Sequence, residues 1–264
     1  MSAAQVDAPG FHPGPQGICG KVKGWVVVAG LGPGADGLVT PDVAAALAAA
    51  TDVVGYAPYV ARVLPRAGLA LHASDNRVEL ARAAHALRLA ARGRRVVVVS
   101  SGDPGVFAMA SALFEAMEGR PDWQRLEVRV LPGITAMLAA AAAAGAPLGH
   151  DFCAINLSDN LKPFDLVLRR VWLAAEGDFA MAFYNPRSRA RPDQFGQVLE
   201  VLRTRCEPDR LVIFARAVST PDQEIRVVTL DTAREEMADM RTVVLVGSSR
   251  TRVVGRFVYT PRSA

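Results

Sequence analysis

The chain has 264 residues, of which 51% are hydrophobic and 21% are charged, and its formal net charge is +4. This length and hydrophobic content support a substantial core, in one large domain or in two of ordinary size. The net charge is too small for a typical nucleic-acid-binding protein, which carries dense runs of lysine and arginine. A mildly basic surface suits a small substrate with several carboxylates, because the arginine guanidinium group pairs well with a carboxylate.

The cysteines and the apolar segments indicate a cellular compartment. Cys19, Cys153 and Cys206 lie far apart and match no metal-binding spacing, so we expect free thiols in a reducing cytosol and no bound metal. No basic segment followed by an apolar one opens the chain, which argues against a signal peptide. The most apolar run, 134–148, is too short to span a bilayer. We therefore expect a cytoplasmic protein with neither a membrane nor a nucleic acid as partner.

The first half of the chain alternates strands with helices after a segment rich in glycine and proline. That segment shows no periodicity, so we predict a disordered tail over 1–24. Buried strands are expected at 25–29, 53–55, 96–99 and 126–131. Helices are expected at 41–50, 79–92, 106–117 and 135–144. Thr40 is expected to cap the first helix and Gly93 to end the second. This alternation predicts a mostly parallel sheet.

The second half begins with a Gly-Ala-Pro-Leu-Gly segment at 145–149, which we expect to act as a hinge. Strands are then expected at 152–157, 179–184, 211–215, 224–229 and 242–246, and helices at 163–175, 192–205 and 231–237. Only a short turn separates 211–215 from 224–229, which predicts an antiparallel hairpin and therefore a mixed sheet. The sequence thus predicts an α/β fold with two α/β domains, over 25–146 and 147–260, and a cleft between them.

The glycine turn at 30–35 fits the dinucleotide-binding pattern GxGxx(G/A) only in part. That pattern requires an acidic residue at the end of the second strand, but Asp52 precedes that strand here. No GxxxxGK(S/T) sequence is present, so a P-loop nucleotide-binding site is not supported. Two interpretations of the turn stay open. It is either a tight connection between strand and helix or a cradle of backbone N–H groups for an anion.

The turn at 100–105, Ser-Ser-Gly-Asp-Pro-Gly, follows a buried valine strand, and ligands of open α/β sheets bind at such strand ends. Asp103 in this turn either closes an Asx turn on its own backbone or accepts a hydrogen bond from a ligand. His150 and the Ser158-Asp159-Asn160 cluster likewise allow a structural role or a role in a site. Arg187 and the neighbouring arginines form either a solvated loop or a basic patch that faces an anionic substrate.

Taken together, the turns resemble those of a known family. The segments concerned are GLGPG at 30–34, SSGDPGVFAMA at 100–110, LPGITA at 131–136, GAPLGHDF at 145–152, FYNPRS at 183–188 and VVLVGSS at 243–249. In this order they resemble the tetrapyrrole methyltransferases that use S-adenosylmethionine, and the resemblance covers about 25–260. It implies two α/β domains with S-adenosylmethionine bound in the cleft between them, and a homodimer.

The resemblance also implies roles for individual residues. Those that match the family's cofactor contacts are Pro33, Ser101, Gly102, Asp103, Val106, Thr135, Ala136, Asn185 and Val218. Those expected to contact the tetrapyrrole are Gly32, Gly34, Ser158 and Arg187. Since the cofactor has no phosphate, the turn at 30–34 need not bind one, and we expect it where cofactor and substrate meet.

Within the family, four stretches resemble members that methylate C17 of precorrin-3B on the aerobic route to cobalamin. They are VGYAPYV at 54–60, ASDNRVELARA at 73–83, GHDFCAINLSDNLKPFD at 149–165 and YNPRS at 184–188. The implied reaction methylates this polycarboxylate and contracts its ring to give precorrin-4. It requires the carbon to lie in line with the S–CH3 bond, and a base that deprotonates the C20 hydroxyl would assist it. His150 and Asp159 are the candidates for that base.

Three alternatives stay open. The first is another methyltransferase of the family, either the anaerobic one that acts on a cobalt-containing substrate or one that methylates a different carbon. The second is a carrier that holds a corrinoid intermediate without catalysis. The third is a nicotinamide-dependent oxidoreductase, which the position of Asp52 disfavours.

Overall fold

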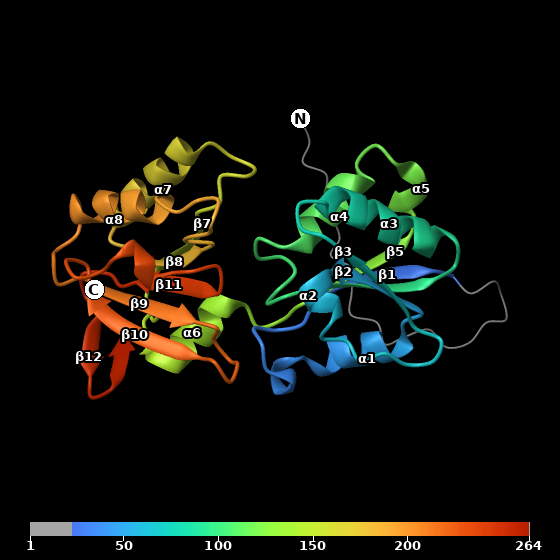
Figure 1. The fold of residues 1–264 in the computed structure, drawn as a ribbon, viewed down its shortest axis with the longest axis horizontal. Helices are drawn as coiled ribbons and strands as arrows, with labels where there is room; N and C mark the ends of the chain where they lie inside the picture. The colour runs from blue at the N-terminus through green and yellow to red at the C-terminus, as the bar shows by residue number, and fades with distance from the viewer. Residues whose placement is uncertain (1–22, 264) are drawn as a thin grey trace.

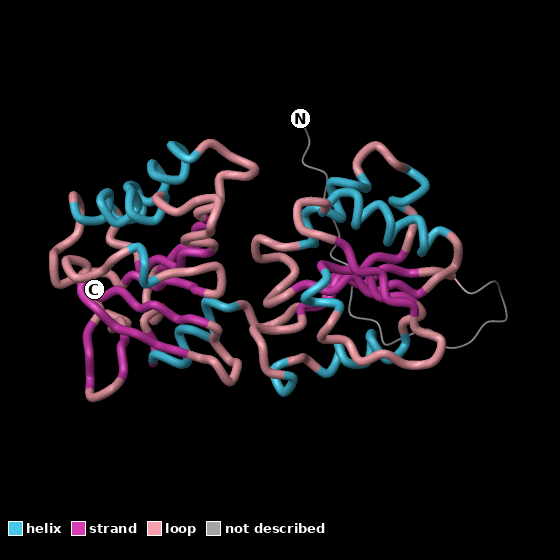
Figure 2. The backbone as a smooth tube through the Cα atoms, in the orientation of Figure 1, coloured by secondary structure: helices cyan, strands magenta, loops and turns pink. Residues whose placement is uncertain are grey.

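The computed structural model describes residues 23–263, so the predicted disordered tail, apart from its last two residues, lies outside the described residues. The described chain forms two α/β units that lie side by side, each with a sheet between helices (Figures 1 and 2). This arrangement confirms the predicted α/β class. In Figure 1 the first unit runs from blue to green and the second from lime to red.

The first unit is built on five parallel strands in the order β3-β2-β4-β1-β5. The strands are β1 (Trp25–Gly30), β2 (Asp52–Tyr56), β3 (Ala70–Ser74), β4 (Arg95–Ser100) and β5 (Glu127–Leu131). The central strands β1 and β4 are runs of fully buried valine, because helices cover both faces of the sheet. The parallel order brings the carboxyl ends of all five strands to one edge, and the predicted site turns follow β1, β4 and β5 there.

Helices cover both faces of this sheet. On one face lie α3 (Glu79–Ala91), α4 (Met109–Met117) and α5 (Pro121–Gln124), and on the other α1 (Pro41–Ala49) and α2 (Ala57–Val60). A short 3-10 turn, η1 (Asp36–Leu38), precedes α1. The first helix begins as predicted, since the Val43 N–H donates to Thr40 Oγ1 at 3.4 Å. Gly93, with a φ of +83°, follows the end of α3 as expected.

The second unit is built on a sheet in the order β10-β9-β11-β8-β7. The strands are β7 (Phe152–Asn156), β8 (Ala180–Tyr184), β9 (Leu211–Arg216), β10 (Glu224–Thr229) and β11 (Thr242–Val246). The pair β9 and β10 forms the predicted antiparallel hairpin, whereas β7 and β8 run parallel, so the sheet is mixed as expected. Two helices, α7 (Phe164–Glu176) and α8 (Gln194–Arg203), cover one face of it.

The other face of the second sheet is covered by α6 (Ala136–Ala144), which the sequence-based division had assigned to the first domain. Its buried residues Ala140, Ala141 and Ala144 belong to one core cluster with Ile213 and Leu245. Alanine has no side chain beyond Cβ, so this helix lies close to the sheet. The chain therefore crosses from one unit to the other before α6, and not after the boundary expected at 146.

A small third sheet, β12-β13-β6, closes the second unit. A hairpin of β12 (Arg252–Val254) and β13 (Phe257–Tyr259) pairs in parallel with β6 (Gly145–Ala146). The Thr260 N–H also donates to the Ala146 carbonyl at 3.0 Å, and the Thr260 hydroxyl donates to the Pro147 carbonyl at 2.6 Å. The segment 145–149, which we expected to act as a hinge, is therefore fixed to the last strand of the described chain.

Two predicted helices differ from the structure. The helix expected at 231–237 is reduced to a 3-10 turn, η2 (Glu235–Met237). The side chains of Thr229 and Thr232 bond to each other and to nearby backbone, which competes with helix formation. The helix expected from residue 106 begins only at Met109.

None of the helices in the described part of the chain has the length and hydrophobicity needed to cross a membrane.

A partly buried polar cluster joins β2, β3 and α3. Asp52 is 1% exposed, accepts a hydrogen bond from Arg94 Nε at 2.7 Å, and pairs with His72 Nε2 at 2.9 Å. The other ring nitrogen of His72 lies 3.2 Å from Nε2 of His85, which α3 provides. Burial, and then the neighbouring His72 and Arg88, lower the pKa of His85 below its ordinary value. The folded protein therefore favours the neutral form of His85.

The lowered pKa of His85 predicts a loss of stability in mildly acidic solution. Near the ordinary histidine pKa of about 6.5 the unfolded chain takes up a proton that the folded chain resists, so stability falls as the pH drops below that value. Urea unfolding at about pH 7.5 and about pH 5 measures the effect. The wild type should lose more unfolding free energy between these pH values than His85→Gln does. Equal losses would contradict the prediction.

Candidate functional site

Three glycines allow the strand-end turns of the first unit to meet. Gly30 ends β1, and a Cβ there would lie 2.5 Å from the Gly102 carbonyl oxygen and 2.8 Å from Gly133 Cα. A Cβ on Gly133 would overlap the same carbonyl oxygen. Gly102 also exchanges two backbone hydrogen bonds with Gly32, of 2.9 and 3.2 Å. The turns that follow β1, β4 and β5 therefore form one continuous backbone surface.

Asp103 holds two of these turns together. Its Oδ1 accepts the Gly105 N–H at 2.8 Å, which is the Asx turn that the sequence allowed. Its Oδ2 accepts the Gly133 N–H at 3.1 Å, from the turn after β5. Both carboxylate oxygens thus already bind backbone, and the side chain fixes the shape of the site. Each oxygen keeps a second lone pair, so a direct contact from Asp103 to a ligand stays a prediction.

Arg62, which the sequence analysis did not single out, supports the turn at 30–34. Its guanidinium group donates hydrogen bonds to three carbonyl oxygens, those of Leu31 at 2.7 Å, Gly32 at 3.3 Å and Gly34 at 3.1 Å. The charge of Arg62 is thus used to hold the turn. As a result, the turn at 30–34 offers a ligand neutral backbone groups in place of a free cation.

Tyr184, at the end of β8, binds the start of α6. Its hydroxyl accepts the Met137 N–H at 3.0 Å and forms a second, short hydrogen bond with Thr135 Oγ1. This hydroxyl caps the helix in place of Thr135, the N-cap residue, whose own side chain makes no cap bond. Burial raises the pKa of Tyr184, so the hydroxyl is protonated at neutral pH. The ring of Phe107 lies edge to face against Tyr184, with 5.3 Å between ring centroids.

Asn185 and Asn156 join the ends of β8 and β7. Asn185 Nδ2 donates to Asn156 Oδ1 at 3.0 Å, and the same oxygen accepts the Ser158 N–H at 2.9 Å. Lys162 Nζ donates to the backbone carbonyl of Asn156 at 2.7 Å. The predicted site residues Asn185 and Ser158 therefore lie together, at the carboxyl ends of two parallel strands.

Val218 lies in a turn of the second unit that packs against the first. It is preceded by Ala217, with a φ of +47°, and followed by Ser219, with a φ of +63°. A Cβ added to Gly34 would lie 2.5 Å from Thr220 Cγ2 and 2.9 Å from the Ser219 carbonyl oxygen. Because Gly34 has no side chain, the turn at 30–34 and the turn at 217–220 pack directly against each other.

Left-handed backbone is concentrated around these turns. Of the described residues other than glycine, the positive-φ residues here are Phe107 at 52°, Asn185 at 53°, Ala217 at 47° and Ser219 at 63°. Such conformations cost free energy in L-residues, and they cluster at ligand sites where the surrounding structure enforces them. The groups around them are small, apolar or already bonded to backbone. The region therefore suits a ligand without phosphate.

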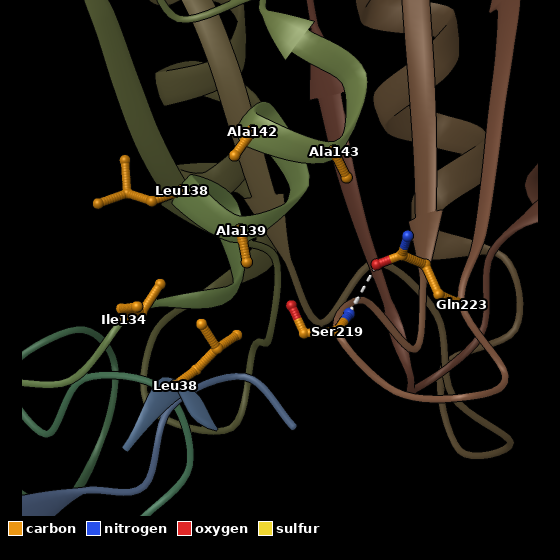
Figure 3. A pocket seen from close by; sticks show the side chains of 8 residues that line it. All are labelled: Leu38, Ile134, Leu138, Ala139, Ala142, Ala143, Ser219 and Gln223. Carbon is orange, nitrogen blue, oxygen red and sulfur yellow. Dashed lines mark hydrogen bonds between the residues drawn. The ribbon is translucent and has the colours of Figure 1, made fainter. Parts of the chain in front are cut away.

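An apolar cavity of about 400 Å³ lies beside these turns (Figure 3). It is lined by Leu38, Ile134, Leu138, Ala139, Ala142, Ala143, Ser219 and Gln223. The Ser219 N–H donates to Gln223 Oε1 at 2.7 Å across one wall. None of the lining residues is ionisable and none is a predicted site residue, so these residues offer no acid or base for catalysis.

Asp159 lies in the loop after β7 and contacts the segment that follows β8. Its Oδ2 accepts a hydrogen bond from Gln194 Nε2 at 2.7 Å, and its Oδ1 lies 3.9 Å from Arg191 Nε. Arg191 Nη1 and Gln194 Oε1 are buried and have no hydrogen-bond partner among the described residues. Arg187 Nε donates to the Pro192 carbonyl at 3.0 Å. A carboxylate and two arginines thus lie beside the carboxyl ends of β7 and β8.

His150 is not part of this arrangement. It precedes β7, whereas the site residues follow that strand, and the five residues of the strand, Phe152–Asn156, span about 13 Å. Its Nδ1 lies 3.7 Å from a carboxylate oxygen of Asp151, which is largely exposed. His150 therefore lies before β7, whereas Asp159 lies after it, and a role of His150 as the general base stays a prediction.

The structure brings the other predicted site residues into one region. They are Gly32, Pro33, Gly34, Ser101, Gly102, Asp103, Val106, Thr135, Ala136, Ser158, Asp159, Asn185, Arg187 and Val218, all in turns or loops that follow strands or, for Ala136, at the start of α6. The contacts of Gly102 with Gly32, of Asp103 with Gly133 and of Tyr184 with Thr135 connect these turns.

Within residues 23–263, no group of three or more His, Cys, Asp or Glu side chains is placed to hold a metal ion.

Known sequences support the same family as the motifs. A profile described as Tetrapyrrole (Corrin/Porphyrin) Methylases matches residues 26–234. A precorrin-3B C(17)-methyltransferase of a Sinorhizobium species is 51% identical over 247 residues, which covers 91% of this chain and 97% of that protein. A probable cobalt-factor III C(17)-methyltransferase of Salmonella typhimurium is 36% identical over 242 residues, covering 89% of this chain and 97% of that protein.

Solved structures agree with this result. The crystal structure of the methyltransferase CobJ matches with a TM-score of 0.89 and 73% identity, covering 90% of this chain and 100% of that one. A uroporphyrin-III C-methyl transferase from Thermus thermophilus, complexed with S-adenyl homocysteine, shares the fold with a TM-score of 0.63 at 20% identity, covering 85% of this chain and 92% of that one. The chain therefore belongs to the tetrapyrrole methylase family, a family of methyltransferases.

The close contact of the glycine turns predicts that Gly133→Ala destabilises the protein by about 2 kcal/mol or more, because the added Cβ meets backbone that cannot move aside. Chemical denaturation measures the change. Gly37→Ala is the matched control, since a Cβ there meets no atom within 4 Å. Its stability should stay within about 0.5 kcal/mol of the wild type. If both variants unfold at the same denaturant concentration, the contact does not restrain the turns.

Proposed function

We propose that this protein transfers a methyl group from S-adenosylmethionine to C17 of precorrin-3B and contracts the ring to give precorrin-4, in cobalamin biosynthesis. The observation that carries the proposal is the 51% identity to the Sinorhizobium enzyme named for C17 methylation of precorrin-3B, over nearly the full length of both chains. The identity to the cobalt-factor III enzyme is 36%, which favours the metal-free substrate. A cobalt-containing substrate is the alternative.

We infer that the cofactor lies among the turns after β1, β4, β5, β8 and β9. When bound, S-adenosylmethionine supplies a methyl group activated by a sulfonium. These turns offer it backbone groups and small side chains, which suits a ligand without phosphate, and Arg62 is already committed to carbonyl oxygens. The residues that we expect to contact it are Pro33, Ser101, Gly102, Asp103, Val106, Thr135, Ala136, Asn185 and Val218.

We expect the tetrapyrrole beside the loops that follow β7 and β8, and against the turn at 30–34. Its carboxylates would face Ser158 and Arg187, with Lys162 and Arg191 adding positive charge to the same edge of the second sheet. In the turn at 30–34 we expect Gly32 and Gly34 to contact the macrocycle through their backbone, because protein atoms already fill the space that a side chain on either residue would occupy. On this assignment the protein accelerates methyl transfer mainly by holding C17 in line with the S–CH3 bond.

Asp159 is the base that we propose for the C20 hydroxyl. Gln194 holds one of its carboxylate oxygens at 2.7 Å, which orients the group. The side chain of Asp159 is 35% exposed, so a substrate in the neighbouring loops could reach it. The carboxylate would accept the hydroxyl proton while the ring contracts.

The direct test incubates the purified protein with precorrin-3B and S-adenosylmethionine labelled in the methyl group. Mass spectrometry and NMR should then show one labelled methyl group at C17 and a contracted ring. Methylation at another carbon, or methylation of a cobalt-containing substrate alone, would overturn the substrate assignment. Calorimetry that shows binding of the corrinoid but not of S-adenosylmethionine would identify a carrier.

Asp159→Asn should slow the formation of precorrin-4 in single-turnover assays by about 100-fold, because the amide keeps the shape of the side chain but cannot accept the proton. The affinity for S-adenosylhomocysteine, measured by calorimetry, should be unchanged. His150→Asn, at the opposite end of β7, should retain the wild-type rate. A slow His150 variant together with an unaffected Asp159 variant would instead assign the base to His150, the other candidate from the sequence.

The sequence resemblance further leads us to propose a homodimer that acts in the cytoplasm. Sedimentation of the purified protein at micromolar concentration should give the mass of two chains. A monomer under these conditions would contradict the proposed assembly without bearing on the reaction.

A further inference from the structure

Phe107 has a backbone conformation that folding alone does not explain. Its φ is +52°, in the left-handed region that suits glycine and, less often, asparagine. A bulky aromatic side chain pays a conformational penalty there. Nor does burial account for the residue, because 48% of it is exposed. A strained and exposed aromatic side chain indicates a role outside the core.

The ring of Phe107 rests against a partner that is itself fixed. Its centroid lies 5.3 Å from that of Tyr184, with 63° between the ring planes. Tyr184 is anchored through its hydroxyl to Met137 N–H and Thr135 Oγ1. The edge-to-face contact uses part of the Phe107 surface and leaves the rest open to solvent. The two rings therefore form a rigid aromatic corner between the two units.

This corner lies where the two groups of predicted contacts meet. Phe107 belongs to the turn that also contains Asp103 and Val106, from the first unit. Tyr184 is followed directly by Asn185, whose side chain bonds to the end of β7 in the second unit. The aromatic corner therefore lies between the turns of the first unit, which offer neutral backbone groups, and the loops of the second unit, which carry lysine and arginine.

We propose that Phe107, backed by Tyr184, is the platform on which the conjugated ring system of the tetrapyrrole rests. This inference rests on the proposed function and adds a residue that orients the substrate. An aromatic ring is suited to the apolar face of a conjugated macrocycle, as base-stacking side chains are in nucleic-acid-binding proteins. The carboxylates at the rim of the macrocycle would then reach Lys162, Arg187 and Arg191. The strained backbone of Phe107 aims the ring at the substrate.

A purely structural role of Phe107 would have different consequences when the residue is replaced. If the ring only joined the two units, its loss would lower the stability of the protein and the affinity for both ligands together. If it is a substrate platform, Phe107→Gly should leave the melting temperature equal or higher, because glycine removes the strain at the positive φ. The affinity for the tetrapyrrole should nevertheless fall.

The experiment titrates precorrin-3B into the protein saturated with S-adenosylhomocysteine, so that binding is measured without turnover. Phe107→Leu should weaken tetrapyrrole binding by about tenfold or more, and Phe107→Tyr should retain it, because the tyrosine keeps the ring. The affinity of both variants for S-adenosylhomocysteine alone should stay within about twofold of the wild type. Phe114→Leu is the matched control, since Phe114 is 49% exposed on α4 and touches neither predicted binding region.

Any one of three results would contradict the proposal that Phe107 is a platform for the tetrapyrrole. Phe107→Leu could bind precorrin-3B as tightly as Phe114→Leu does. It could lose affinity for S-adenosylhomocysteine in the same proportion, which would place the ring against the cofactor. Phe107→Gly could melt at a markedly lower temperature and lose both ligands, which would make the ring a structural contact. Wild-type methylation of precorrin-3B is measured separately, so a failure of the proposed reaction is distinguished from a failure of the platform.

Discussion

The contact of Gly30, Gly102 and Gly133 is the constraint on which the site depends. Strand β1 lies between β4 and β5 in the sheet. The turns that follow β4 and β5 therefore meet over the end of β1. Backbone meets backbone there, with no room for a Cβ on Gly30 or Gly133. Only with this closure can Asp103 bond across to the turn after β5. Any separation of these turns would also displace Phe107 and Thr135, which face the second unit.

The two units contribute different chemistry to the region between them. The first presents neutral backbone in its turns, where Arg62 donates its hydrogen bonds to carbonyl oxygens. The second presents loops with Lys162, Arg187 and Arg191 around the ends of β7 and β8. Tyr184 lies where these parts meet, because its ring contacts Phe107 of the first unit and its hydroxyl binds the start of α6, immediately after the chain crosses between the units. A cofactor without phosphate and a substrate rich in carboxylates match this division.

Local patterns in the sequence predicted much of the fold and of the site, and the failures have identifiable physical causes. Valine runs located β1 and β4, and the rule that ligands bind at strand ends grouped Gly102, Asp103 and Thr135 correctly in space. The sequence analysis missed contacts between residues that lie far apart in the chain. Arg62 reaches carbonyls 28 to 31 residues away, and no local pattern marks it. The alanine-rich α6 joined the second sheet because packing, and not sequence position, decides its neighbours. His150 and Asp159 were both candidates because the direction of β7, which places them at opposite ends of that strand, was not considered.

The pairing of β6 with β13 governs the order in which the molecule can be completed during synthesis. Gly145 and Ala146, which follow α6, pair with Val258 and Tyr259, and the Ala146 carbonyl also accepts the Thr260 N–H, more than a hundred residues later. The strands and helices of the first unit are all present long before that point. Nascent chains fold from the N-terminus as they emerge, so the first unit can form on the ribosome while the second waits for its final strand. The part of the candidate site that the second unit supplies is therefore incomplete until residues 258–260 have been synthesised.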